Sequence, residues 1–135
     1  MTEFAVPEGQ RAWERTCHSA ITRDIIWRLD AYRAALYLFH CVRADLARVA
    51  ASPSVQDQLL RAGGGVSAAI SEGYSRRTRA DRHRFYNYAL GSIRECFTWY
   101  VGLDDLLEPS VLDERLETVS RNLALTTGLL RSDRG

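Results

Sequence analysis

Four long segments of the chain carry apolar residues at alternating steps of three and four positions. The segments are residues 22–51, 55–73, 79–106 and 110–130. Pro53, Gly73 and Pro109 stand at the breaks between them. This spacing gathers apolar side chains on one face of an α-helix, and no strand-like alternation is long enough to compete. The chain is therefore predicted to be all-α.

The short breaks between the four predicted helices favour an antiparallel up-and-down four-helix bundle. At 135 residues the chain is long enough for one domain whose core needs neither disulfides nor a metal. We expect this domain to cover residues 21–131. Residues 1–20 are expected to form an N-terminal extension, with either a short extra helix or the beginning of the next one, and residues 132–135 a disordered tail.

Glycines mark points where helices are expected to end or to approach closely. Residues 63–65 are all glycine inside a predicted helix, where each costs about 1 kcal/mol relative to alanine. Either another helix packs very closely there or the helix is broken, and the continuous register of the flanking residues favours close packing. Gly73 suits a left-handed cap position. Gly91 and Gly102 are expected to allow close helix crossings.

The composition excludes several classes of protein. All 18 cationic residues are arginines, so a nucleotide-binding loop that needs its lysine is excluded. Cys17, Cys41 and Cys96 lack paired spacing and are expected to be reduced thiols that fill the core. The first residues lack the apolar core of a secretion signal, and no run approaches the ~20 apolar residues that cross a membrane. A cytoplasmic protein with no membrane partner is expected.

No pattern of a catalytic, metal or cofactor site is found. His18 and His40 each adjoin a cysteine, but adjacent residues on a helix point about a quarter-turn apart, and His83 has no partner at ligand spacing. No serine lies in a nucleophile elbow, and no strand precedes the glycine run as a dinucleotide site requires. We expect no catalytic residue, no metal and no cofactor.

Charge is distributed unevenly although the formal net charge is only +1. Residues 61–94 hold seven arginines against Glu72 and Asp81, a net charge of +5. Residues 95–135 hold four arginines against eight acidic residues, a net charge of −4. This asymmetry predicts a basic patch on an otherwise balanced molecule.

The basic patch is the leading candidate for a functional site. Its proposed nucleic-acid-binding residues are Arg76, Arg77, Arg79, Arg82, Arg84 and Tyr86. Arginines near a helix N-terminus position phosphates, and neighbouring tyrosines stack on exposed bases. The alternative is that these arginines are solvated and pair with Asp81, Glu72 or the acidic last segment. Nothing in the segment encodes sequence-specific base recognition.

Three motifs carry a resemblance to a known family. They are Gln-Leu-x-Arg-Ala from Gln58, Ile-x-Glu-Gly ending at Gly73, and Ala-x-Gly-Ser-x-x-Glu ending at Glu95. Trp27 stands where the family's first helix usually has a tryptophan. Over residues 22–130 the chain resembles the small bacterial four helix bundle proteins. That group includes proteins encoded in intervening sequences of 23S rRNA genes and is related to the accessory variability determinant of diversity-generating retroelements.

The resemblance implies a four-helix bundle, commonly a homopentamer, with a basic surface for nucleic acid and no enzymatic activity. Its motif residues here are Glu72, Gly73, Gly91, Ser92 and Glu95. Ala69 replaces an asparagine that is usual in the family, and the glycines at 63–65 replace residues that are usually alanine or serine. Any function that depends on that asparagine is therefore not expected here.

Glu72 and Glu95 are expected to have a structural role. We predict partly buried carboxylates that pair with Arg61, Arg76 or Arg94 between the two central helices. On this prediction Glu72→Ala leaves an arginine unpaired and loosens the bundle.

Two functions follow as hypotheses. The first is a non-catalytic homo-oligomer that binds nucleic acid, RNA or an RNA–protein complex, through the arginines. The second is an accessory protein that docks a partner such as a reverse transcriptase through wide apolar helix faces. Residues 79–106 carry two apolar seams, which suggest contacts on two sides of that helix, one within the protomer and one with a partner protomer. Binding of nucleic acid weakens steeply with salt, whereas apolar docking tolerates salt.

Overall fold

The computed structural model describes residues 5–133 and is all-helical over that range. The elements are α1 (Glu8–Glu14), α2 (Ser19–Thr22), the 3-10 helix η1 (Ile25–Arg28), α3 (Asp30–Leu46), α4 (Pro53–Tyr74), α5 (Arg79–Val101) and α6 (Pro109–Ser132). The predicted all-α class is confirmed. Residues 1–4 of the predicted extension and 134–135 of the predicted tail lie outside the described residues.

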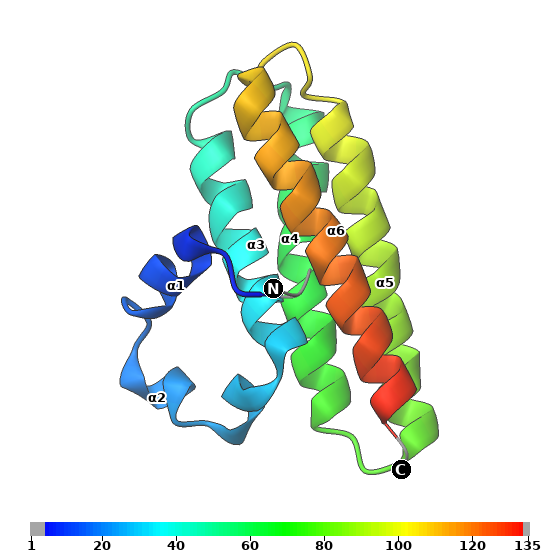
Figure 1. Cartoon of the computed structure of the whole chain (residues 1–135). Coiled ribbons are helices and arrows are strands. Elements are labelled where there is room, and N and C mark those ends of the chain that lie inside the picture. The colour runs from blue at the N-terminus through cyan, green and yellow to red at the C-terminus, as the bar shows by residue number, and fades with distance from the viewer. Residues whose placement is uncertain (1–4, 134–135) are drawn as a thin grey trace.

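The four long helices α3, α4, α5 and α6 lie side by side, and short connections join consecutive helices at alternate ends (Figure 1). Helix α4 packs against α3 and α5, and α6 packs against α5 and α3. Each long helix therefore has two neighbours, and the inward faces enclose one core. The short elements α1 and η1 pack on α3, outside this group.

The core comes from the apolar stripes that the sequence spacing indicates. Fully buried side chains from all four long helices are Leu38, Val42, Leu59, Val66, Ile70, Ala89, Ile93, Cys96, Tyr100 and Val119. Both predicted seams of α5 contribute, since Cys96 belongs to one and Tyr100 to the other. The second seam was expected to leave apolar surface for a partner. Its residues instead pack largely within the chain.

The first predicted helix, residues 22–51, is wrong at both ends. The Asp24 carboxylate caps η1 by accepting a hydrogen bond of 3.0 Å from the Ile26 N–H. Leu29 then takes an extended conformation with ψ of 113°, and α3 begins only at Asp30. Ile26 stays buried across this break, so the apolar spacing continues where the helix does not. At the other end α3 stops at Leu46.

Helix α5 also ends earlier than predicted, at Val101 rather than near residue 106. Two tight turns follow, in which the Leu103 N–H donates to the Tyr100 carbonyl and the Leu106 N–H to the Leu103 carbonyl, each at 2.9 Å. Leu103 is nevertheless buried. Here too the apolar pattern extends beyond the end of the helix.

The glycine run at residues 63–65 lies inside a continuous α4, which confirms close packing rather than a break. A Cβ added at Gly63 would lie 3.0 Å from Cγ2 of Val42 on α3. A Cβ added at Gly65 would lie 2.9 Å from Oγ of Ser92 on α5. The missing side chains therefore let α4 approach both of its neighbours.

The other glycine predictions fail. Gly73 is not a left-handed cap: it lies within α4, and an added Cβ would lie 2.8 Å from Cε1 of Tyr86. Gly91 allows no close crossing in this chain, because an added Cβ would meet nothing within 4 Å. At Gly102 an added Cβ would meet only carbonyl groups of the preceding turn.

A buried ion pair joins three of the long helices. Asp45 of α3 is only 3% exposed. Its Oδ2 accepts hydrogen bonds of 2.7 Å from Tyr100 Oη of α5 and from Arg115 Nε of α6, and Arg115 Nη2 donates to Oδ1 at 3.1 Å. Burial, and next the hydrogen bond to Asp45, raise the pKa of Tyr100 above its ordinary value. Tyr100 therefore remains a neutral donor to the carboxylate.

Polar contacts also fasten the N-terminal extension to the long helices. Gln10 of α1 is 1% exposed, and its Oε1 accepts a hydrogen bond of 2.8 Å from Arg121 Nη1 of α6. The Trp13 ring lies 5.8 Å from both the Tyr37 and His40 rings of α3. The apolar spacing of the last helix would leave Arg121 on a solvated face, and the fold instead uses it to hold α1.

Candidate nucleic-acid interface

The arginine segment occupies the connection between α4 and α5 and the first turns of α5. Helix α4 ends at Tyr74, and Thr78 caps α5 because its Oγ1 accepts a hydrogen bond of 3.2 Å from the Asp81 N–H. This cap places Arg79 and Arg82 in the first turn of α5, beside the loop that holds Arg76 and Arg77.

The Arg82 side chain is hydrogen-bonded both to this loop and to the end of α6. Its Nη1 donates to the Arg77 carbonyl at 2.8 Å and to the Arg76 carbonyl at 3.3 Å. Its Nε donates to Asp133 Oδ2 at 3.0 Å and to Oδ1 at 3.2 Å. Arg79 Nε donates to the Asp133 backbone carbonyl at 3.1 Å. The expected pairing of some arginines with the last segment is therefore found at Asp133, where the tail was predicted to be disordered.

Arg76 and Arg84 both lie against one aromatic ring. The Cζ atom of each is 4.9 Å from the centroid of the Phe85 ring, a cation–π distance. Arg76 also pairs with Glu72, and Arg84 lies 3.7 Å from Asp81. Both arginines are exposed, as is Arg77, which has no ion-pair partner among the described residues.

Tyr86 cannot stack on a base in this fold, because it is only 2% exposed and packs beneath Gly73. Burial, and next the nearby Asp133 carboxylate, raise its pKa to about 12. Tyr88 is 55% exposed and lies edge-on to Phe85, with ring centroids 5.6 Å apart. The exposed tyrosine of this region is therefore Tyr88, and not Tyr86 as predicted from the sequence.

The arginine segment is slightly less basic in the fold than in the sequence, where Arg76, Arg77, Arg79, Arg82 and Arg84 against Glu72 and Asp81 give a formal charge of +3. Its five arginines have three carboxylate partners, Glu72, Asp81 and Asp133, for a formal charge of +2. The fold adds the Asp133 charge from a distant part of the chain. Four arginines, Arg76, Arg77, Arg79 and Arg84, still present exposed side chains at this end of the molecule.

The two motif glutamates do not bridge the central helices. Glu72 is 51% exposed, and its partner Arg76 lies four residues further along the same stretch. Glu95 is exposed and makes no ion pair with the residues that the structure describes. Ser92, by contrast, lies in the contact between α4 and α5 beside Gly65.

Glu72→Ala is therefore expected to cost no more than about 1 kcal/mol in free energy of unfolding, the usual range for an exposed ion pair. This revises the expectation that the change loosens the fold. Urea denaturation of the variant beside wild type measures the difference. A loss above about 2 kcal/mol would show that the carboxylate has a buried role.

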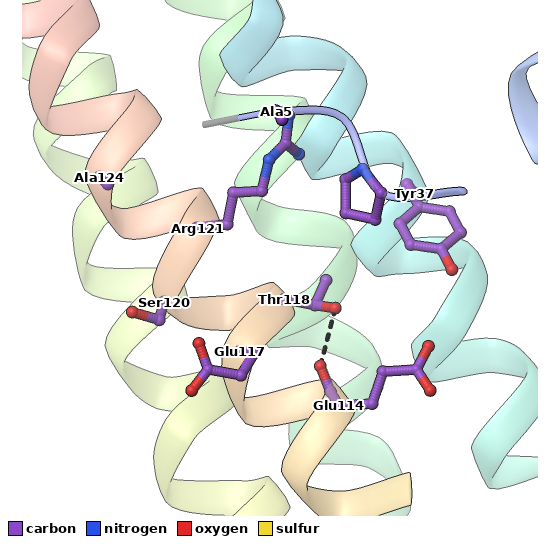
Figure 2. Close-up of a pocket in the computed structure, with 9 residues that line it drawn as sticks. Ala5, Tyr37, Glu114, Glu117, Thr118, Ser120, Arg121 and Ala124 are labelled. Carbon is purple, nitrogen blue, oxygen red and sulfur yellow. Dashed lines mark hydrogen bonds between the residues drawn. The ribbon is translucent and has the colours of Figure 1, made fainter. Parts of the chain in front are cut away.

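One concave site lies away from the arginine segment and is acidic. A cleft of about 370 Å³ runs between residues 5–7, α3 and α6, and is lined by Tyr37, Glu114, Glu117, Thr118 and Arg121 among others (Figure 2). Thr118 Oγ1 donates to the Glu114 carbonyl at 2.9 Å, and the Glu114 and Glu117 carboxylates point out from α6. Two carboxylates repel a phosphate backbone, so this cleft does not extend the arginine surface.

Within residues 5–133, no group of three or more histidine, cysteine, aspartate or glutamate residues is placed to hold a metal ion. Cys41 and Cys96 are buried free thiols, as expected of residues that fill the core. In the same range, no helix combines the length and apolar character needed to span a membrane.

Comparison with known proteins agrees with the motifs at Gly73 and Glu95. A family model described as 23S rRNA-intervening sequence protein matches residues 26–123, which is more than half of the chain. The match includes α3, α4 and α5 completely, and with them the arginine segment, and it ends before Asp133. No curated protein matches the chain. The matched span and the helical fold together show that the chain belongs to the 23S rRNA-intervening sequence protein family.

Proposed function

We propose that this chain is a non-catalytic protein that binds RNA, or an RNA–protein complex, through the arginine segment. The observation that carries the proposal is the grouping of exposed Arg76 and Arg84 at the Phe85 ring, with exposed Arg77 next to Arg76 in the same loop. The family is named for an intervening sequence of 23S rRNA and is not a known enzyme family.

Binding by this surface is mainly electrostatic. Exposed guanidinium groups contact phosphates, and the first turn of α5 adds its unpaired backbone N–H groups. Tyr88, which is 55% exposed, offers a ring on which a base can stack. No side chain here is arranged to read base edges, so the surface favours backbone and shape over sequence.

The scaffold of this surface is an antiparallel up-and-down four-helix bundle of α3, α4, α5 and α6, assembled as a homo-oligomer. A formal charge of +2 on one arginine segment is modest. Repetition of the segment around a ring, with the pentamer that the family resemblance implies, would add these charges into a basic belt. Light-scattering mass tests the oligomer directly.

Changing Arg76, Arg77 and Arg79 together to alanine is expected to weaken binding of single-stranded RNA by at least about tenfold in low salt. Each phosphate contact that is lost should also reduce the slope of log K against log salt by ~0.7. Fluorescence titration of one labelled RNA at two salt concentrations measures both effects. The three side chains are exposed, so the variant should keep its fold.

The matched control changes Arg43, Arg48 and Arg61 to alanine. These arginines are also exposed but lie in α3, after α3 and in the first half of α4. The control removes the same charge from a different part of the surface. Equal losses in both triple variants would show that only net charge matters, and the proposal for this site would then be wrong.

A second candidate function is docking of a protein partner, such as a reverse transcriptase, as an accessory subunit. Val101 and Leu106, which are 53% and 42% exposed, favour it because they lie at and after the end of α5, away from the arginines. Wild-type protein that ignores RNA at every salt concentration, yet retains a partner at high salt, would favour this function.

A further inference from the structure

The end of α6 is held against the arginine segment by a carboxylate in a cationic site. Asp133 is the first residue after α6, and its side chain is 14% exposed. Arg82 Nε donates to both of its carboxylate oxygens, at 3.0 and 3.2 Å, and the Arg82 side chain is 13% exposed. Arg79 Nε donates to the backbone carbonyl of the same residue at 3.1 Å.

His83 completes this site. Its Nε2 lies 3.3 Å from Asp133 Oδ2, yet this nitrogen is buried and has no hydrogen-bond partner among the described residues. The planar carboxylate therefore accepts from Arg82 Nε but leaves the neighbouring His83 nitrogen without a hydrogen bond. An anion with oxygens in more than one plane would reach both groups.

The chemistry of this site also suits a phosphate group. Arginine binds carboxylates and phosphates through the same charge-assisted hydrogen bonds. A tetrahedral phosphate can place one oxygen on Arg82 and another on His83. Arg82 Nη1 still donates to the Arg76 and Arg77 carbonyls, so the site should keep its shape when the carboxylate leaves.

We propose that Arg79, Arg82 and His83 form a phosphate-binding site of the arginine segment, in which the Asp133 carboxylate is a built-in competitor that a nucleic-acid phosphate displaces. The inference rests on the proposed function and specifies where one RNA phosphate binds. It also assigns an inhibitory role to the end of α6. RNA binding and release of Asp133 then become two parts of one equilibrium.

A chain of phosphates can displace a tethered carboxylate where a single phosphate cannot. Asp133 is attached to α6 and has a high effective concentration at the site, so a lone anion competes poorly. RNA that already contacts exposed Arg76 and Arg77 holds its next phosphate close to Arg82, whose Nη1 donates to the carbonyls of both residues. Asp133 directly follows Ser132, the last residue of α6.

The test compares Asp133→Asn with Asp81→Asn. Asp81 is exposed, lies in the same first turn of α5 and pairs with Arg84, so both variants lose one negative charge close to the arginines. Only Asp133→Asn removes the competitor. We expect it to bind single-stranded RNA at least about fivefold more tightly than Asp81→Asn does, the lower end of coupling between sites.

A second measurement uses sodium tripolyphosphate and does not depend on RNA. The compound should raise the melting temperature of Asp133→Asn clearly more than that of wild type, because it fills the site that the carboxylate has left. Asp81→Asn should respond as wild type does. Each shift is measured against the same variant without the compound, so any stability lost with the Asp133 ion pair cancels.

The two measurements separate the inference from the proposed function. If wild type binds RNA in a salt-dependent way but Asp133→Asn binds no more tightly than Asp81→Asn, the competitor role is wrong and the proposed function stands. If tripolyphosphate stabilises Asp133→Asn while no variant binds RNA, the anion site is supported and RNA binding is wrong. If neither ligand distinguishes the variants, Asp133 is only a structural ion pair.

Discussion

Arg115→Ala is expected to lower the free energy of unfolding by about 3–5 kcal/mol, because it leaves a buried carboxylate without its counter-charge. Asp45 is 3% exposed, and Arg115 donates two hydrogen bonds to it, at 2.7 and 3.1 Å. After the change, Tyr100 is the remaining donor to the Asp45 carboxylate among residues 5–133. Urea denaturation followed by circular dichroism measures the loss. For a domain of ordinary stability, ~5–15 kcal/mol, such a loss is severe.

Two controls show whether the loss arises from the stranded charge. Arg61→Ala removes an arginine whose pair with Asp57, at 3.0 Å, is largely exposed, and it should cost less than about 1 kcal/mol. The double variant Asp45→Ala and Arg115→Ala should cost clearly less than the sum of the single changes, since no charge remains buried and unpaired. Additive losses would mean that the unpaired carboxylate is not the source of the instability.

The position of Asp45 was available in the sequence but was not recognised. Leu38, Val42 and Asp45 follow one another at steps of four and three, so the pattern that places the two apolar residues in the core also places the aspartate there. A carboxylate at a core position requires a partner. The partner could not be identified from the pattern, because it depends on how α6 faces α3.

The fold class was predictable because apolar spacing reports which residues face the core. The same spacing could not locate the helix ends. Ile26 before the break and Leu103 after Val101 are buried although neither lies in the adjoining long helix. Turns of 3-10 type keep side chains near the positions that a helix would give them. Helix ends depend instead on local caps such as the Asp24 carboxylate.

Counting charges along the sequence identified the arginines of the candidate site. It did not identify the residues with which they pair. Arg82 was grouped with its neighbours, yet it is committed to Asp133 and to two loop carbonyls. The end of α6 lies beside the start of α5 (Figure 1), so this contact could be expected once disorder at the end of α6 is not assumed. Tyr86 and Tyr88 differ only in helical register, and Tyr86 shares the buried face with Ala89 and Ile93.

Gly73→Ala and Gly91→Ala are the same chemical change and are expected to have opposite effects. At Gly73 the new Cβ would lie 2.8 Å from Tyr86 Cε1 and 3.0 Å from Phe85 Cβ. Neither group can move easily, because the Tyr86 ring is 2% exposed and a Cβ atom is fixed to its backbone. Overpacking of this kind costs about 1–3 kcal/mol. Gly73 is the residue before the last one of α4, so the higher helix propensity of alanine adds little stability there.

At Gly91 the new methyl group meets nothing within 4 Å and lies in the middle of α5. Replacing an exposed interior glycine by alanine should therefore raise the free energy of unfolding by about 0.5–1 kcal/mol. Thermal and urea denaturation of both variants beside wild type measure whether each change lowers or raises the free energy of unfolding. A stable Gly73→Ala protein would mean that α4 and α5 can separate at little cost. Loss of stability in Gly91→Ala would mean that another molecule covers this face of α5, as expected if this face is the contact surface of the proposed homo-oligomer.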